Sequence, residues 1–221
     1  MGNTTSHTRI AACHASPILL DAKETTKKTV SLVREAAAHG ANIVVFPESF
    51  IPAFPVWSAP RAPTENHEFF RRMATESVFA DGEEIAAVRG GGAAARRRPK
   101  CFGVLCAGVL DEEAAALLSF GSSDGEAVMQ GLLRLPRGAT MFLDTTGALL
   151  PGFTFADKDD KSSEKCVTEY LQKEEGILYA HVDLDACIEG KQYHDVAGGY
   201  QRLDVFELKV DRTRREPVVF K

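Results

Sequence analysis

The chain has 221 residues, of which 44% are apolar and 26% charged, and this length allows one domain or at most two. A net charge of −5 gives no electrostatic reason to expect nucleic acid or an anionic membrane as a partner. Residues 1–9 are polar and no run reaches the roughly 18 apolar residues of a membrane span, so neither a signal peptide nor a membrane anchor is expected.

The number and spacing of the cysteines and histidines indicate whether disulfides or a metal site are expected. The cysteines stand at positions 13, 101, 106, 166 and 187, with no Cys-x-x-Cys pair and an odd total. This pattern predicts free thiols in a reducing compartment, and hence a cytoplasmic protein. The histidines are scattered without a His-x-x-x-His pair, so we expect no metal site.

The first third of the chain reads as a strand, a helix and a second strand. Arg9 to Ala15 is apolar at its centre and predicts a strand. Asp21 and Glu24 form a capping-box pattern for the following helix, which Gly40 ends. Ile43 to Phe46 is too short an apolar run for a helix and predicts a buried strand. Such a unit calls for two parallel strands joined by a right-handed crossover.

The stretch after the second strand carries the first candidate site residue. Pro47 ends the strand because it has no N–H to donate, and Glu48 follows it directly. Chemistry in open α/β sheets sits just beyond the carboxyl ends of strands. The loop that follows is stiffened by two prolines and carries Phe50, Phe54 and Trp57.

We expect these aromatic side chains to leave the Glu48 carboxyl poorly hydrated, which would raise its pKa toward the range of a general base. The residues alone also allow the plainer interpretation that Glu48 is a helix N-cap or a solvated loop acid.

The rest of the chain alternates helical and strand-like stretches. Two short helices are predicted over 65–73 and 82–89. Residues 89–99 contain three homotriplets in a row. This low-complexity stretch indicates a solvated face, a basic patch for a binding partner, or a junction where two stretches of the chain are joined. Further strands are predicted at 101–110, 138–144, 148–150, 176–184 and 203–210, helices at 112–118 and 126–134, and an exposed or disordered loop at 156–165. The order predicts a mixed α/β fold.

Several of these stretches together resemble the nitrilase branch of the carbon–nitrogen hydrolases. Phe46-Pro47-Glu48-Ser49-Phe50-Ile51-Pro52 is similar to that family's catalytic-glutamate motif, and residues 9–17 match the strand before it. Later stretches also resemble the family, so that the likeness extends over about 1–90 and about 100–221; they are 136–138, 174–180, 191–196 and 199–206.

The resemblance implies an αββα sandwich that dimerises and often builds larger spirals. It also implies a Glu-Lys-Cys triad that works without a cofactor. In that chemistry a cysteine thiolate adds to a nitrile carbon, a glutamate moves protons, and a lysine ammonium stabilises charge on the nitrogen. By the resemblance, Glu48 is the catalytic glutamate.

The family's lysine and cysteine motifs are absent from this sequence. The family's nucleophile precedes a tryptophan, whereas the single tryptophan here is Trp57. Cys106 has no charged or aromatic neighbour in sequence, so we expect a raised thiol pKa and an inert side chain. Nothing around Lys100 matches the family's lysine motif. Both motifs belong between residues 89 and 101, so we expect one domain over 1–221, an incomplete αββα sandwich with an internal deletion near 90–100.

Three hypotheses follow for function. The first is a nitrilase-type hydrolase of nitriles or cyanide, with Glu48 catalytic and the chain inactive as it stands. Phe54 and Trp57 would then line the substrate pocket, or else pack against a neighbouring subunit. The second is a non-catalytic subunit that forms homo-oligomers or co-assembles with a full-length nitrilase. The third is a splice or gene-model fragment with no role of its own.

Overall fold

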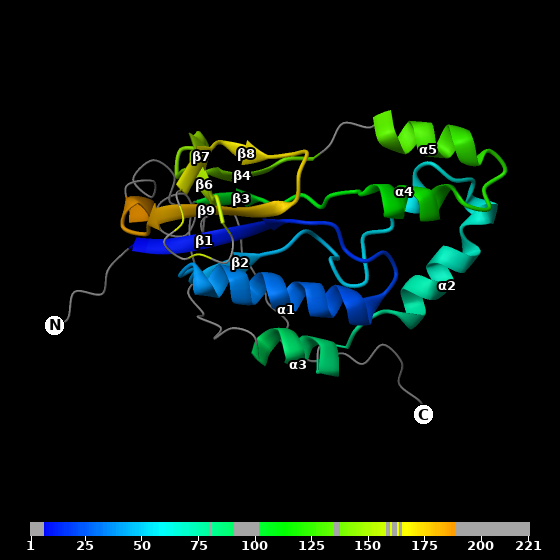
Figure 1. The fold of residues 1–221 in the computed structure, drawn as a ribbon, viewed down its shortest axis with the longest axis horizontal. Coiled ribbons are helices and arrows are strands. Elements are labelled where there is room, and N and C mark those ends of the chain that lie inside the picture. The colour runs from blue at the N-terminus through cyan, green and yellow to red at the C-terminus, as the bar shows by residue number, and fades with distance from the viewer. Residues whose placement is uncertain are drawn as a thin grey trace, which may run out of the picture.

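A computed structural model describes residues 7–79, 81–90, 102–134, 138–157, 160, 163 and 165–188. It shows two β-sheets stacked face to face, with helices along one side and at one end (Figure 1), which confirms the α/β class. Some predicted features lie outside the described residues: most of the low-complexity stretch, Lys100, Cys101, the family-like stretches at 191–196 and 199–206, and the strand at 203–210.

The first sheet has the strand order β2-β1-β9-β6-β7. Its strands are β1 (His7–His14), β2 (Ile43–Val45), β6 (Gly152–Phe155), β7 (Lys165–Thr168) and β9 (Gly176–Asp183). β1 and β2 are parallel, as the strand–helix–strand pattern predicts. β9 pairs antiparallel with β1 along its whole length, from His7 opposite Asp183 to His14 opposite Gly176. Residues 162 to 176 positions apart in sequence, from the pair His14 and Gly176 to the pair His7 and Asp183, therefore form the centre of the sheet.

The crossover between β1 and β2 is α1 (Ala22–Ala38). It begins where the sequence predicts, because the Asp21 side chain accepts a hydrogen bond from Glu24 N at 2.9 Å. It ends before Gly40, whose φ of +77° is easy only for glycine. Its inner side packs on the outer side of the first sheet through a cluster of buried residues: Ala11, Cys13, Ala36, Phe153, Ile177 and Tyr179.

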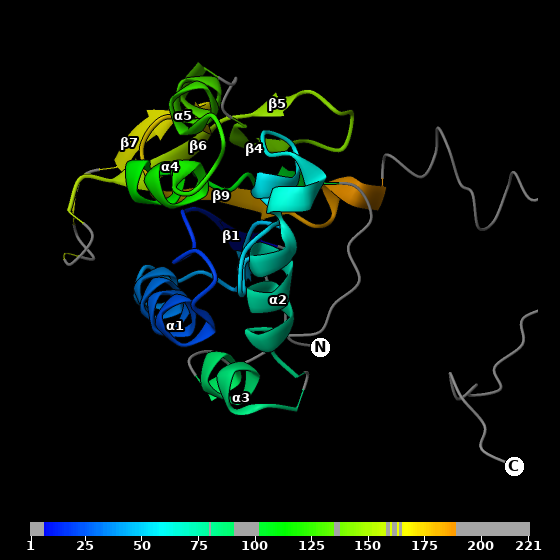
Figure 2. The same cartoon turned by 90° about the vertical axis from the view of Figure 1, so that its right-hand side faces the viewer.

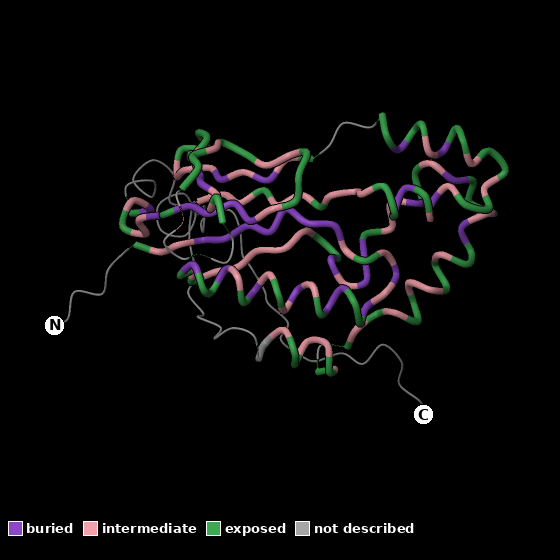
Figure 3. Tube along the Cα trace, viewed as in Figure 1, coloured by how far each residue is buried: buried purple, intermediate pink, exposed green. Residues whose placement is uncertain are grey.

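The second sheet lies against the inner face of the first. It consists of β3 (Gly103–Leu105), β4 (Thr140–Leu143), β5 (Leu149–Leu150) and β8 (Tyr170–Leu171), which are all antiparallel. The buried layer between the sheets is Ile10, Ala12, Phe142, Leu178, Ala180 and Val182. Figure 3 shows β1 and β9, which supply five of these six residues, as the most continuously buried parts of the trace.

The remaining helices gather mainly beyond one end of the sheets. They are the 3-10 turns η1 (Val56–Ser58) and η2 (Pro63–Glu65) and the helices α2 (His67–Thr75), α3 (Glu83–Gly90), α4 (Glu112–Ser119) and α5 (Gly125–Arg134). α3 lies beside α1 (Figure 2), and the others form a lobe beyond the end of the strands (Figure 1). A third apolar cluster fills that lobe: Leu20, Trp57, Ala115, Leu118, Val128 and Leu132. No helix of the described ranges is long and apolar enough to cross a membrane.

The layers are thus helix, sheet, sheet, and none of the described helices covers the outer face of the second sheet (Figure 1). We call this surface the open face; it consists of Leu105, Met141, Leu143, Leu149 and Tyr170. These residues share a side because they pair across the strands. The side chains of Leu105, Leu149 and Tyr170 are 47, 38 and 47% exposed. An αββα sandwich would cover this face, so the described part of the fold is incomplete.

The strand predicted over 101–110 is shorter than expected. Only Gly103–Leu105 pairs with β4. Residues 106–110 leave the sheet and run past the end of β1, where Val109 N donates to Ala15 O at 3.1 Å. The apolar character of these residues therefore serves the wall of a cavity.

Candidate functional site

A cavity of about 240 Å³ opens where the parallel strands β1 and β2 end. Its walls come from four segments: residues 16–19 after β1, residues 47–56 after β2, residues 106–110 after β3, and the first turn of α4. The lining residues are Ser16, Pro17, Leu19, Pro47, Glu48, Phe50, Ala53, Phe54, Val56, Cys106, Gly108, Val109, Leu110 and Ala114. This is the position at which open α/β sheets bind ligands.

Glu48 lies on the cavity wall, but its side chain is exposed. The expectation of a poorly hydrated carboxyl is therefore wrong. The cause is the path of the loop, which turns at once through Ser49 at φ +52°. That turn carries Phe50 into the core, where its ring lies 5.3 Å from the ring of Phe46. The aromatic side chains of this loop stabilise its shape more than they shield the carboxyl.

Phe54 and Trp57 lie on opposite sides of the cavity wall. Phe54 lines the cavity and is 48% exposed. Trp57 is fully buried and is not among the lining residues. Its ring stacks on Phe69 at 5.5 Å and packs against α4 and α5. Of the two alternatives left open by the sequence, Trp57 follows neither: it packs within its own chain, behind the wall.

Cys106 lines the same cavity as Glu48, which the sequence did not suggest. Its Sγ donates to the carbonyl oxygens of Cys13 at 3.3 Å and Val45 at 3.6 Å. Burial raises the pKa of the thiol to about 11, although hydrogen bonding with the Thr140 side chain and the Cys13 backbone opposes the rise. A thiol with this pKa is protonated at neutral pH and so is a poor nucleophile.

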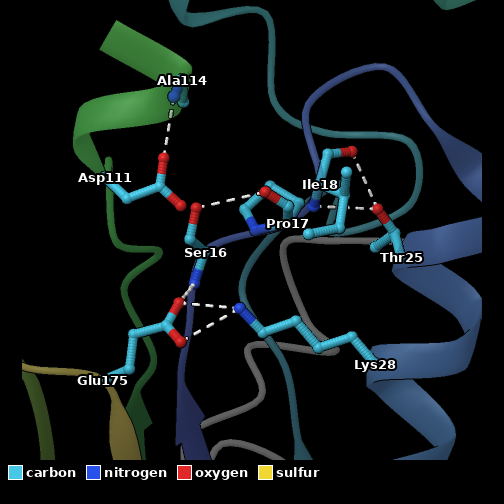
Figure 4. Close-up of polar contacts among 8 residues, drawn as sticks. All are labelled: Ser16, Pro17, Ile18, Thr25, Lys28, Asp111, Ala114 and Glu175. Carbon is cyan, nitrogen blue, oxygen red and sulfur yellow. Dashed lines mark hydrogen bonds and ion pairs between the residues drawn. The ribbon is translucent and has the colours of Figure 1, made fainter.

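The loop after β1 is held by side chains of α1 and by Glu175, which is distant in sequence (Figure 4). Ser16 N donates to the Glu175 carboxylate, which also binds Lys28 Nζ through both oxygens at 2.9 and 3.0 Å. Thr25 Oγ1 accepts from Ile18 N at 3.0 Å and donates to Ile18 O at 2.9 Å. These contacts tie the loop to α1 and to the start of β9, and no local signal in the sequence reveals them.

The cavity has one formal charge among its described lining residues, the Glu48 carboxylate. The lysine that the family resemblance calls for has no counterpart there, since no lysine, arginine or histidine is among those residues. Across the described ranges, no group of three or more His, Cys, Asp or Glu side chains is placed to hold a metal ion.

Comparisons with known proteins match the part of the chain that supplies Glu48 and its loop. The family model described as "Carbon-nitrogen hydrolase" matches residues 9–90. The bromoxynil-specific nitrilase of Klebsiella pneumoniae subsp. ozaenae is 41% identical over 81 residues, which are 37% of this chain and 23% of that protein. An arylacetonitrilase of Aspergillus oryzae is 50% identical over 83 residues, 38% of this chain and 24% of that protein. An aliphatic nitrilase of Sinorhizobium fredii is 42% identical over 86 residues, which cover 35% of this chain and 28% of that protein.

The matched part of the chain spans about a quarter of the length of these curated relatives. The family match includes β1, α1, β2, Glu48 and the loop that lines the cavity, and it stops at residue 90, inside the low-complexity stretch. Residues 9–90 of this chain therefore match the carbon–nitrogen hydrolase family, and the relatives that share this segment are nitrilases.

Proposed function

We propose that this chain is a nitrilase-type protein that binds small nitriles in the Glu48 cavity but does not hydrolyse them by the covalent route. The observation that carries the proposal is the composition of the cavity wall: it holds a carboxylate and a protonated thiol, and its described residues include no cation. In this role Glu48 is the general base inherited from the family, and Phe54 contacts the ligand. Trp57 supports the wall from behind.

The missing step is nucleophilic attack. A thioimidate forms only if a thiolate adds to the nitrile carbon while a positive group stabilises the charge that develops on nitrogen. With a pKa of about 11, only about one Cys106 thiol in 10⁴ is ionised at pH 7. The Sγ also donates to carbonyl oxygens of Cys13 and Val45. Glu48 alone can move protons but cannot replace this step.

The names of the relatives bound the ligand class without fixing it. The relatives include a bromoxynil-specific nitrilase, arylacetonitrilases and aliphatic nitrilases. The cavity of about 240 Å³ has mostly apolar walls, which suits one ring or a short alkyl chain better than a large polar molecule. We propose small apolar nitriles as the class.

An internal deletion near 90–100, within one domain over 1–221, accounts for the missing lysine and cysteine. The end of the family match at residue 90 supports it, as does the open face left by the described helices. A reducing, cytoplasmic setting fits the free thiols found at Cys13, Cys106 and Cys166.

The test measures ammonia release from phenylacetonitrile and from cyanide by the purified chain, together with phenylacetonitrile binding by NMR. We expect binding and no ammonia above that of Glu48→Ala. Ammonia release that Glu48→Ala abolishes would overturn the inactivity. Absence of phenylacetonitrile binding would overturn the role of the cavity.

A second candidate is an interaction subunit, and the open face favours it. Five apolar side chains on one side of a sheet, with no charged residue among them, are typical of a surface that another protein covers. The partner would be a second copy of this chain or a full-length nitrilase. Co-expression with a full-length nitrilase and co-purification through a tag on this chain tests it, and separate elution of the two proteins would contradict it.

A further inference from the structure

We propose that the Glu48 cavity selects small organic ammonium ions, a primary amine on a single ring or short apolar chain, over neutral and anionic molecules of the same shape. The proposal uses the cavity of the proposed function and rests on it in that respect. It goes beyond it by naming a ligand that is not a nitrile. The argument has three steps: the charge on the wall, the charges around it, and the apolar surface.

The wall carries an unmatched negative charge. Glu48 is the one charged side chain among the described lining residues, and its carboxylate forms no ion pair in the described part of the chain. In an enzyme with a lysine beside the glutamate, that ammonium would balance the carboxylate. Here the balancing charge has to come from water, salt or the ligand, so a ligand that brings an ammonium gains an interaction that a neutral ligand lacks.

The surrounding charges do not cancel that of Glu48. The first turn of α4 borders the cavity through Ala114, and Leu110, just before the helix cap, lines it as well. Its positive dipole end is offset by the Asp111 cap, which accepts from Ala114 N at 2.8 Å, and by two first-turn glutamates. Lys28, the cation tied to the loop after β1, is held by both oxygens of Glu175. The local field therefore favours a cation and opposes a carboxylate ligand.

The rest of the wall suits the apolar part of such a ligand. Leu19, Val56 and Leu110 supply aliphatic surface, and the half-exposed Phe54 supplies an aromatic ring. Aromatic rings attract organic cations as well as apolar groups. The volume of about 240 Å³ admits a single ring with a short arm, so benzylammonium is the matched probe.

The experiment titrates the full chain with benzylammonium, benzyl alcohol and benzoate, followed by protein NMR shifts and by calorimetry. We expect benzylammonium to bind about tenfold more tightly than benzyl alcohol, and benzoate to bind most weakly. Glu48→Gln should abolish the preference, so that benzylammonium and benzyl alcohol bind with affinities equal to within about twofold. The control is Glu83→Gln, which removes the same charge from the exposed start of α3 and should keep the preference.

The possible results separate this proposal from the proposed function. Equal affinities for benzylammonium and benzyl alcohol, or a preference that survives Glu48→Gln, would overturn the ammonium selectivity. If phenylacetonitrile still binds in that case, the proposed function stands. Ammonia release from nitriles would overturn the proposed inactivity and leave the measured ammonium preference untouched.

Discussion

At the scale of single residues, Cys106 illustrates how backbone contacts decide what a thiol can do. Its Sγ donates to two carbonyl oxygens, and its burial raises the pKa to about 11. Because the folded-state pKa is raised, the thiol stays neutral until the pH approaches 11. Alkylation needs the thiolate, so the rate of iodoacetamide labelling at Cys106 should rise about tenfold per pH unit from 7 to 10. Peptide mass spectrometry measures this rate.

The control for Cys106 is its own removal. Cys106→Ser leaves the other cysteines in place, so the labelled peptide must disappear while labelling of the exposed Cys166 continues. A labelling rate at Cys106 that levels off near pH 8 would contradict the raised pKa, and would reopen the question of nucleophilic catalysis in the cavity.

Glu48 shows which features of the site can be predicted from the sequence and which cannot. The position of Glu48, directly after a strand that a proline ends, follows from local pattern. Its exposure does not, because that depends on the turn at Ser49 and on where Phe50 and Trp57 pack. Glu48 and Cys106 line one cavity although their segments lie about 60 residues apart in sequence, and no spacing rule reveals this.

At the scale of elements, β9 is the strand on which both sheets depend. Its alternate residues face the two buried layers, with Ala180 inside the sandwich and Tyr179 under α1. Ala180→Asp would place a carboxylate without a partner between the sheets, and we expect a loss of at least about 3 kcal/mol in the free energy of unfolding. Urea denaturation followed by circular dichroism measures it.

The neighbouring position provides the matched control. His181 is exposed, and its Nε2 lies 3.4 Å from Arg9 Nη2. His181→Asp introduces the same carboxylate one residue along and beside a cation, so the unfolding free energy should change by less than about 0.5 kcal/mol. Equal losses for the two variants would show that the strand register is different.

The loop after β1 is a second element whose geometry depends on distant residues. Lys28→Met removes the ion pair with Glu175 that supports the Ser16 amide. Since the pair is partly exposed, we expect at most about a fivefold increase in the hydrogen-exchange rate of Ser16 N–H. Lys27→Met removes the exposed pair with Glu24 one residue earlier and should not change this rate. An unchanged exchange rate of the Ser16 N–H in Lys28→Met would mean that the ion pair between Lys28 and Glu175 does not order the loop.

Elements with a strong local signal were predicted well. The strand–helix–strand unit of β1, α1 and β2 follows from the Asp21 cap, the Gly40 stop and two apolar runs, and the structure confirms it. The apolar stretch at 101–110 was predicted as one strand, but it divides into β3 and a cavity wall. An apolar run cannot distinguish these outcomes, because a sheet edge and a cavity wall both use apolar side chains at partly buried positions.

At the scale of the whole molecule, the open face leaves apolar side chains exposed that a sandwich fold would cover. In a sandwich, each sheet buries one face on the other sheet and the second face on helices. The first sheet has α1 and α3 outside it, whereas the described helices leave the second sheet bare (Figure 1). Apolar side chains in that position favour association, since contact with another protein removes them from water. We therefore expect the purified chain to sediment as a dimer or larger species.

Charge on the open face should disrupt that association. Leu149 and Tyr170 are exposed at positions that do not face the buried layer between the sheets, so Leu149→Lys combined with Tyr170→Lys should leave the fold intact. The double variant should sediment as a monomer, because two like charges would have to be buried against the partner. Leu133→Lys, at an exposed leucine of α5, is the control and should behave as the unaltered chain. A monomeric unaltered chain, or a double variant that still associates, would show that the open face is not the interface.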